Sequence, residues 1–177
     1  MADWITTYGG IHFFPLDPEA DKIEITDVAH ALSLICRGNG HVKTFFSVGQ
    51  HCIHCALEAE ARGYGSRIAL ACLLHDASEG YISDIIRPVK IYLTNYLEIE
   101  DQIMSVIWQH FHLELTSEEH KKWKQIDDEI LDSELKEMFS GEAERIPVPL
   151  RSTPDFSKHP YEEVEAEFIT LAKGLLK

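Results

Sequence analysis

Apolar residues recur at steps of three and four along most of the chain, as they do in helices that bury one face. The clearest case is Ile25 to Cys36, where Val28, Ala29, Leu32 and Ile35 fall on one stripe. The same pattern predicts further helices over residues 47–62, 66–79, 92–112, 116–139 and 161–176. No series of buried strands alternates with these helices, so the pattern predicts an all-α fold rather than an α/β fold.

Two of the expected helices begin with a capping box, in which two side chains three residues apart bond to each other's backbone N–H groups. Ser47 is followed by Gln50 at this spacing, and Thr116 is followed by Glu119. Such a box indicates a definite helix start. We therefore expect a compact helical bundle with well-defined beginnings at these two positions.

The remaining segments suggest how the chain is organised. A Gly-Gly pair within residues 5–14 favours a small N-terminal hairpin in an otherwise irregular start. Residues 141–160 hold four of the seven prolines and indicate a surface loop, and residues 161–176 form an amphipathic helix. We expect one domain over residues 1–177, with its core in about residues 25–140.

The charge of the chain restricts its partners. With 16 basic and 30 acidic residues, the net charge is −14, which argues against a nucleic acid polymer or an anionic membrane as partner. No run approaches the ~20 apolar residues of a membrane span, and the start MADWITTYGG lacks the pattern of a signal peptide. We therefore expect a cytoplasmic protein. A small anionic substrate would need local cations in its pocket.

Four polar residues lie on or beside apolar stripes. The stripe of Ile68, Ala71 and Cys72 continues one turn further to His75 and Asp76. A buried carboxylate is costly unless a partner compensates its charge, and a metal ion held with a neighbouring histidine does so.

Two further helices offer matching residues. In KQIDDEILDSELKEM, periodicity turns Asp127 inward with Ile130 and Leu131, whereas Asp128 shares its face with charged residues. His51 lies one turn after Ser47, beside a stripe of apolar residues. Two imidazoles and two carboxylates would form a mixed nitrogen and oxygen site for a divalent metal ion.

Each of these polar residues could also have a purely structural role. A single histidine near a core stripe is more often a hydrogen-bonded core residue than a ligand, and Asp127 could be a buried salt-bridge partner. The cysteines at positions 36, 52, 55 and 72 lie among apolar neighbours in expected helices and indicate buried free thiols. Cys52 and Cys55 could instead form a structural zinc or redox site, but no second CxxC pair exists in the sequence.

The order His51, His75-Asp76, Asp127 resembles the H…HD…D signature of the HD-domain metal-dependent phosphohydrolases. The stretches ITDVAHALSLICRGNGHVKTFFSVGQH and LLHDASEGYISDIIRPVK resemble the branch that contains bacterial 5′-deoxynucleotidases, and KQIDDEILDSE resembles its closing metal-ligand helix. The likeness covers roughly residues 4–140. It implies an HD-type helical bundle, one divalent metal ion (Mn, Co, Zn, Fe or Mg) held by these four residues, and hydrolysis of a nucleotide phosphate.

The resemblance also implies roles for five further residues. Glu79 aligns with a catalytic carboxylate one turn after the HD pair, and Asp84 with a second acidic residue beside the scissile phosphate. Arg37, Lys90 and Lys124 fall where relatives place cationic contacts to the substrate. These cations would provide the local positive field that the net charge of −14 requires.

The resemblance leaves several functions open. The leading expectation is release of inorganic phosphate from (deoxy)nucleoside 5′-monophosphates, and the alternative is a dNTP triphosphohydrolase that releases tripolyphosphate. A protein that binds nucleotide without turnover is a further alternative, weakened by the presence of Glu79 and all four ligands. Related proteins are often dimers, and the apolar C-terminal helix could serve a homodimer interface.

Two departures limit what can be carried over from the family. The deoxynucleotidases place a bulky aromatic residue directly after the arginine, whereas Gly38 and Asn39 follow Arg37 here. Base and sugar preference are therefore not transferred. His110 and His112 could add ligands for a second metal ion, but they lack the spacing of the dinuclear HD enzymes.

Overall fold

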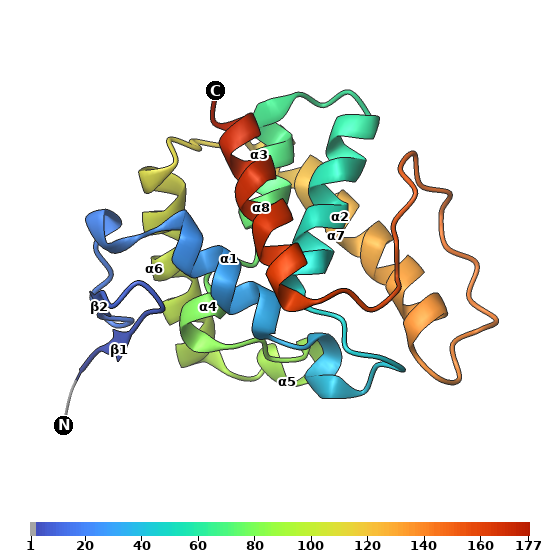
Figure 1. Cartoon of the computed structure of the whole chain (residues 1–177), viewed down its shortest axis with the longest axis horizontal. Coiled ribbons are helices and arrows are strands. Elements are labelled where there is room, and N and C mark those ends of the chain that lie inside the picture. The colour runs from blue at the N-terminus through green and yellow to red at the C-terminus, as the bar shows by residue number, and fades with distance from the viewer. Residues whose placement is uncertain (1–2) are drawn as a thin grey trace.

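Helices account for most of the secondary structure in the computed structural model, which describes residues 3–177 (Figure 1). The α-helices are α1 (Ile25–Leu34), α2 (Val48–Ala61), α3 (Ser66–Leu74), α4 (Glu79–Ile82), α5 (Arg87–Lys90), α6 (Thr94–His110), α7 (Ser117–Met138) and α8 (Tyr161–Leu175). Two short 3-10 helices, η1 (Ala20–Lys22) and η2 (Arg37–Gly40), flank α1. The expected all-α fold class is confirmed.

Both predicted capping boxes are present. The Ser47 hydroxyl accepts the backbone N–H of Gln50 at 3.1 Å, and the Gln50 side chain accepts the N–H of Ser47 at 3.4 Å. The Thr116 hydroxyl accepts the N–H of Glu119 at 3.3 Å, and the Glu119 carboxylate accepts the N–H of Thr116 at 2.7 Å. Each box satisfies two backbone donors that would otherwise lack a partner at a helix start.

The expected N-terminal hairpin is also present, although it is very short. Strand β1 (Ile5–Thr6) pairs antiparallel with β2 (His12–Phe13), so that Ile5 lies opposite Phe13. Gly10 in the turn has a φ of 82°, a conformation that glycine adopts at little cost. The hairpin adds Phe13 to the hydrophobic core.

The helix that was expected over residues 66–79 ends earlier than predicted, at Leu74. The N–H of Ala77 donates to the carbonyl of Leu74, and the N–H of Glu79 donates to the carbonyl of Asp76. Each of these hydrogen bonds spans three residues, rather than the four of an α-helix. This tighter winding separates α3 from the short α4. As a result, His75 and Asp76 lie in the turn between α3 and α4.

Several boundaries differ by a few residues. The first helix ends at Leu34 rather than at Cys36, so Cys36 lies outside a helix and is half-buried. The expected helix 92–112 forms as α6 (Thr94–His110), and the preceding α5 was not predicted. A proline at the second position of α5 is compatible with helix because its missing N–H would have no partner there.

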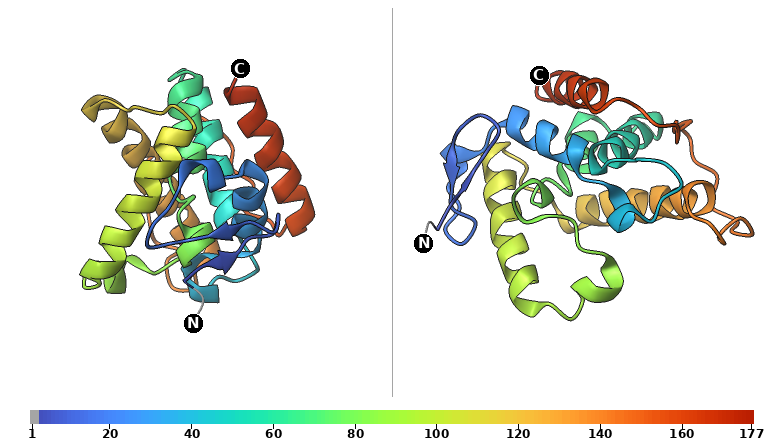
Figure 2. Two further views of the ribbon diagram at one scale, coloured as in Figure 1. Left: turned by 90° about the vertical axis from the view of Figure 1, so that its left-hand side faces the viewer. Right: turned by 60° about the horizontal axis from the view of Figure 1, so that its bottom comes forward.

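Helices α1, α7 and α8 pack in layers around α2 and α3 (Figure 2). Helix α8 crosses one side of this pair and also contacts α1, while α7 packs against the opposite side of α2 and α3. The core between them contains mainly aliphatic residues and Phe168 of α8, which is fully buried. This arrangement places the N-terminal half of α2, the end of α3 and the middle of α7 next to one another.

Residues 141–160 connect α7 to α8 without forming a helix or strand, as the prolines predict. The buried carboxylate of Glu58 on α2 holds this connection in place. It accepts the backbone N–H groups of Arg151 and Ser152, the latter at 2.7 Å, and the Ser152 hydroxyl at 2.6 Å. No helix among residues 3–177 combines the length and apolar character that a membrane span requires.

Candidate metal centre and adjoining cavity

Three parts of the fold bring the four predicted ligands together. His51 lies in the first turn of α2, His75 directly follows α3, Asp76 lies in the next turn, and Asp127 lies in the middle of α7. His51 is fully buried, and His75 and Asp127 are buried too. Asp128 is half exposed, so Asp127 is the aspartate that faces inward, as the helical periodicity predicts.

The side-chain tips of these four residues converge on one point. The His51 Nε2 atom lies 3.3 Å from the Nε2 atom of His75 and 3.2 Å from the Oδ1 atom of Asp127. The Oδ2 atom of Asp76 is 3.8 Å from His51 Nε2 and 3.4 Å from His75 Nε2, and Asp127 Oδ1 is 3.6 Å from His75 Nε2. Four groups with lone pairs therefore surround a common position.

The second nitrogen of each histidine ring determines which atom faces this point. His51 Nδ1 lies 2.7 Å from a carboxylate oxygen of Glu134, and His75 Nδ1 lies 2.7 Å from the carbonyl oxygen of Cys72. Both partners are acceptors, so each Nδ1 carries the hydrogen. A ring that gives up its Nε2 proton to bind a metal ion then presents the Nε2 lone pair to the centre, as histidine ligands do when an acceptor orients them from behind. This donor set fits a metal cation.

The charges around His51 show how strongly the centre attracts positive charge. Burial and the nearby Arg37 lower the pKa of His51, but the carboxylates of Glu134 and Asp127 outweigh them and raise it to about 9. Burial raises the pKa of Asp127, but hydrogen bonds and charge from His51 and His75 hold it well below its usual range. The centre thus stabilises a cation and an ionised Asp127 together.

Two buried thiols lie beside the same centre. His51, Cys55 and His75 each place one potential ligand atom within 4.8 Å of the others, and this buried cluster could hold a metal ion. Cys52, His75 and Asp76 form a second, overlapping group with the same property. Both cysteines are free and buried, as expected from the sequence.

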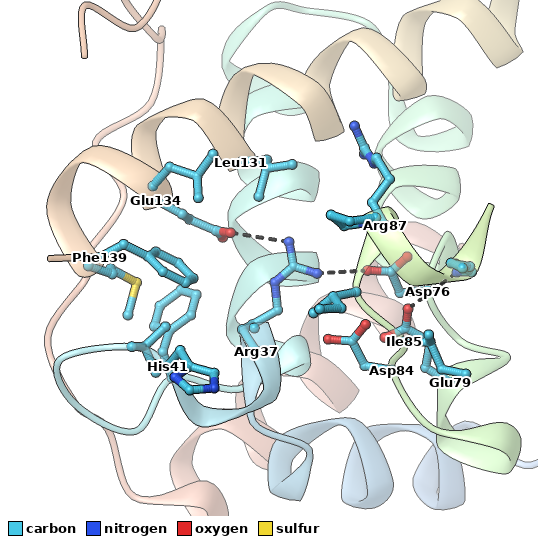
Figure 3. Close-up of a pocket in the computed structure, with 18 of the residues that line it drawn as sticks. Arg37, His41, Asp76, Glu79, Asp84, Ile85, Arg87, Leu131, Glu134 and Phe139 are labelled. Atoms are coloured by element: carbon cyan, nitrogen blue, oxygen red, sulfur yellow. Dashed lines mark hydrogen bonds and ion pairs between the residues drawn. The ribbon is translucent and has the colours of Figure 1, made fainter. Parts of the chain in front are cut away.

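A cavity of about 520 Å³ opens directly beside the centre (Figure 3). Asp76, Glu79 and Asp84 gather on one side of it, and the side chain of Arg37 lies between them and Phe139 on the opposite side. One end of the cavity is thus acidic and adjoins the candidate metal position. The far end is mainly apolar, with His41 beside Phe139.

Arg37 links the cavity to the candidate metal ligands. Its guanidinium donates to Asp76 Oδ2 at 3.4 Å and to Glu134 Oε2 at 3.2 Å. Burial lowers the pKa of Arg37, but the charges of Glu134, Asp76 and further carboxylates raise it, so Arg37 is a permanent cation. A planar guanidinium at this place can bind phosphate oxygens at two points.

Glu134 was not predicted as a site residue from the sequence. It is 2% exposed and contacts both His51 and Arg37. Burial raises its pKa, but the positive charges of His51 and Arg37 lower it to about 2. A signal was present, because Glu134 follows Asp127 by seven residues and therefore lies on the same face of α7 two turns later.

The two carboxylates predicted to be catalytic lie on the cavity wall. Glu79 at the start of α4 is 3% exposed, and its Oε2 atom is buried without a hydrogen-bond partner. Burial, together with the charges of Asp76 and Asp84, raises the pKa of Glu79 well above its usual value. Burial also raises the pKa of Asp84, although the charge of Arg37 counteracts this.

The predicted lysines occupy different positions. Lys90 lines the cavity, and its Nζ atom lies 3.8 Å from Glu79 Oε1 and 2.5 Å from Glu100 Oε1. The described cavity wall does not include Lys124, whose side chain is 52% exposed and whose Nζ atom lies 3.4 Å from Asp127 Oδ2. Lys124 therefore contacts a candidate ligand from the solvent side.

Arg87 is a second cavity residue that was not singled out from the sequence. Its guanidinium donates to Asp127 Oδ2 at 3.4 Å and to Asp128 Oδ1 at 2.9 Å, and its side chain is 56% exposed. His110 and His112, considered for a second metal ion, line a separate hollow together with Asp21 and Glu114. That hollow is lined by none of the four converging residues.

No protein-family model matches the sequence. The chain is similar to the uncharacterized protein YfdR of Escherichia coli, with 37% identity over 110 residues, which are 62% of this chain and 59% of the relative. It is also similar to the uncharacterized protein RCAP_rcc00048 of Rhodobacter capsulatus, with 36% identity over 115 residues and the same two shares. The chain thus spans less than two thirds of the length of these curated relatives.

Proposed function

We propose that the protein is an HD-type metal-dependent phosphohydrolase that acts on small nucleotides. Its leading substrates are (deoxy)nucleoside 5′-monophosphates, and its product is inorganic phosphate. The observation that carries this proposal is the convergence of His51, His75, Asp76 and Asp127, with atoms 3.2–3.8 Å apart, beside a cavity of about 520 Å³.

These four residues are the proposed ligands of one divalent metal ion. Two imidazole nitrogens and two carboxylate oxygens suit Mn, Co, Fe, Zn or Mg. The thiols of Cys52 and Cys55 are the competing donors, but burial raises the pKa of both well above the usual value. When bound, the ion neutralises phosphate charge and lowers the pKa of a water molecule.

Arg37 and Lys90 are the proposed phosphate-binding cations. Both line the cavity near the acidic end, Arg37 beside Asp76 and Lys90 beside Glu79. A phosphate group between them would meet a two-pronged guanidinium and a point charge. They also supply positive charge within a protein whose net charge is −14.

Glu79 and Asp84 are the proposed acid and base. Hydrolysis forms a bond between a water oxygen and phosphorus, breaks the ester bond, and requires a proton for the leaving oxygen. Glu79, whose pKa burial raises well above the usual value, holds the proton for the leaving oxygen, whereas Asp84, for which the charge of Arg37 counteracts the effect of burial on the pKa, accepts the proton of the water. Two carboxyl groups whose environments separate their pKa values can divide these tasks.

A dNTP triphosphohydrolase is the second candidate, and the position of Arg87 and Lys124 favours it. Both side chains are about half exposed and contact Asp127 from the outside, where further phosphate groups of a triphosphate could lie. Their charges are shared with Asp127 and Asp128, so the monophosphate remains the leading substrate.

A panel of substrates and metals tests the proposal. NMPs, dNMPs and dNTPs are each incubated with Mg, Mn, Co or Zn, and the released phosphate species is identified. Inorganic phosphate from monophosphates supports the leading function, and tripolyphosphate from dNTPs supports the second candidate. Absence of any released phosphate from a metal-loaded protein would overturn both.

A double variant tests the ligand set. In Cys52→Ala with Cys55→Ala, the metal content measured by mass spectrometry should equal that of the unchanged protein, because both thiols lie outside the proposed set. Loss of metal from this variant, with its circular dichroism spectrum retained, would assign the ion to the thiols. The protein would then be a structural-metal or regulatory module.

A further inference from the structure

The apolar end of the cavity takes no part in the proposed proton transfer. Apart from the imidazole of His41, its wall is formed by aliphatic and aromatic side chains from α7, from the residue that follows α7 and from the segment before α2, namely Val42, Phe46, Leu131, Leu135, Met138 and Phe139. None of these six side chains can accept or donate a strong hydrogen bond. These six side chains cannot bind a phosphate group, but they can bind a flat apolar ring.

The aromatic ring of Phe139 closes this end against the backbone of Gly38. A Cβ atom built on Gly38 would lie 2.7 Å from the Cζ atom of Phe139, so the ring is in direct contact with the glycine. Gly38 has a φ of 57° and directly follows Arg37. The same short loop therefore supplies a phosphate-binding cation and the support for an aromatic wall.

Helix α7 sets the spacing between the two ends. At a rise of about 1.5 Å per residue, Leu131 lies about 6 Å and Leu135 about 12 Å beyond Asp127 along the helix axis. In Figure 3, Leu131 and Phe139 lie on the opposite side of Arg37 from Asp76, Glu79 and Asp84. A ligand whose phosphate contacts Arg37 beside the metal position would extend along this wall.

We propose that this apolar end is the subsite for the base of a nucleotide and that Phe139 is the residue that stacks on it. This inference rests on the proposed function, because it places the phosphate of the same molecule at the acidic end. A base has an apolar π-face that an aromatic side chain can cover. A sugar phosphate has no such face and would leave the apolar wall exposed to water.

The experiment compares two substrates in three variants. The substrates are a nucleoside 5′-monophosphate and ribose 5-phosphate, which shares the sugar and phosphate but lacks the base. The variants are Phe139→Ala, the conservative Phe139→Tyr, and the control Phe14→Ala. Phe14 is a comparably half-buried phenylalanine that packs against Trp4 after strand β2 and does not line the cavity. KM is measured with the best metal, and Kd by calorimetry.

Loss of base stacking in Phe139→Ala should raise KM and Kd for the nucleotide by about 5- to 150-fold relative to those for ribose 5-phosphate. Phe139→Tyr should restore the preference, and Phe14→Ala should leave the ratio unchanged. An equal change for both substrates, or the same effect in Phe14→Ala, would overturn the subsite.

The readouts separate this inference from the proposed function. If the unchanged protein hydrolyses ribose 5-phosphate and the nucleotide with equal KM, the proposed hydrolase function is supported and the subsite is refuted. Tight nucleotide binding that depends on Phe139, without hydrolysis under any metal, would refute the hydrolase and support the subsite. Failure of the nucleotide to bind at all would refute the subsite.

Discussion

The carboxylate of Glu58 anchors the loop before α8, and its replacement by glutamine tests how much this anchor contributes to stability. Glu58 is 0% exposed and accepts hydrogen bonds from four donors. These are the N–H groups of Arg151 and Ser152, the Ser152 hydroxyl and the Arg62 guanidinium. Glutamine keeps the shape of the side chain but replaces one acceptor oxygen with an NH₂ donor.

The expected loss follows from the number of donors left without an acceptor. The Oε2 atom alone receives the Ser152 N–H at 2.7 Å and its hydroxyl at 2.6 Å. An NH₂ group at this position would leave the Ser152 N–H without a partner, whereas the hydroxyl can rotate and accept from the NH₂ group. An unsatisfied donor at a buried site costs about 1–3 kcal/mol, so we expect Glu58→Gln to lower the free energy of unfolding by about 1–3 kcal/mol. For a chain of this size that corresponds to a decrease in Tm of about 2–12 °C.

Urea denaturation at several pH values provides the assay, with Glu60→Gln as the control because Glu60 is exposed on the same helix. Burial raises the pKa of Glu58, but hydrogen bonds from Arg151 and Ser152 lower it below the usual 4.5. A carboxylate with a lowered pKa stabilises the fold above 4.5, and this contribution disappears as the pH falls through the lower, folded-state value. The difference in free energy of unfolding between wild type and Glu58→Gln should therefore be largest at neutral pH and decrease in acid.

For Glu60→Gln we expect the free energy of unfolding to change by no more than about 0.5 kcal/mol. A change as small as this in Glu58→Gln would refute the anchoring role of Glu58. A difference that does not change between neutral and acidic pH would refute the role of its charge. In that case the lost stability would come from altered packing around the side chain.

Three further predictions address the metal centre and the core. Asp127→Ala should lose bound metal and activity while Asp128→Ala keeps both, and equal loss in the two variants would contradict the assignment of the inward ligand. Glu134→Gln should weaken metal binding by about 10- to 100-fold, measured by titration with Mn²⁺, because Glu134 orients His51; Glu137→Gln, exposed on the same helix, should not. Phe168→Ala should cost about 3–5 kcal/mol in urea denaturation because the side chain is fully buried, and a loss below about 1 kcal/mol would contradict its place in the core.

Local signals in the sequence predicted the helices well where neighbouring residues alone determine the structure. The capping boxes at Ser47 and Thr116 form within four residues, so their hydrogen bonds do not depend on the rest of the fold. The break after Leu74 was not predicted, because the residues that follow it have no glycine or proline to indicate a turn before Gly80. Backbone hydrogen bonds at three-residue spacing follow α3 there instead.

The residues of the candidate site could be predicted where helix periodicity determines which side chains face the core. Asp127 could be separated from Asp128 because they are neighbours on a helix with one apolar face. Glu134 was missed because acidic residues are frequent in α7 and only Asp127 and Glu134 among them are buried, so residue type alone gave no signal and the seven-residue spacing from Asp127 was not used. Arg87 was missed because its contact with Asp127 joins segments 40 residues apart, a distance that no local pattern reports.

The anchor at Glu58 also shows where the chain can accept foreign sequence. Arg145 pairs with Asp132 before the anchor, and Arg151 bonds to Glu58 within it, so residues 146–149 lie between two fixed points. Ile146 there is 93% exposed. Extra residues between fixed ends cost entropy that grows only slowly with their number. An affinity tag or fluorescent reporter inserted after Ile146 would therefore leave both attachments, and the helices that they join, in place.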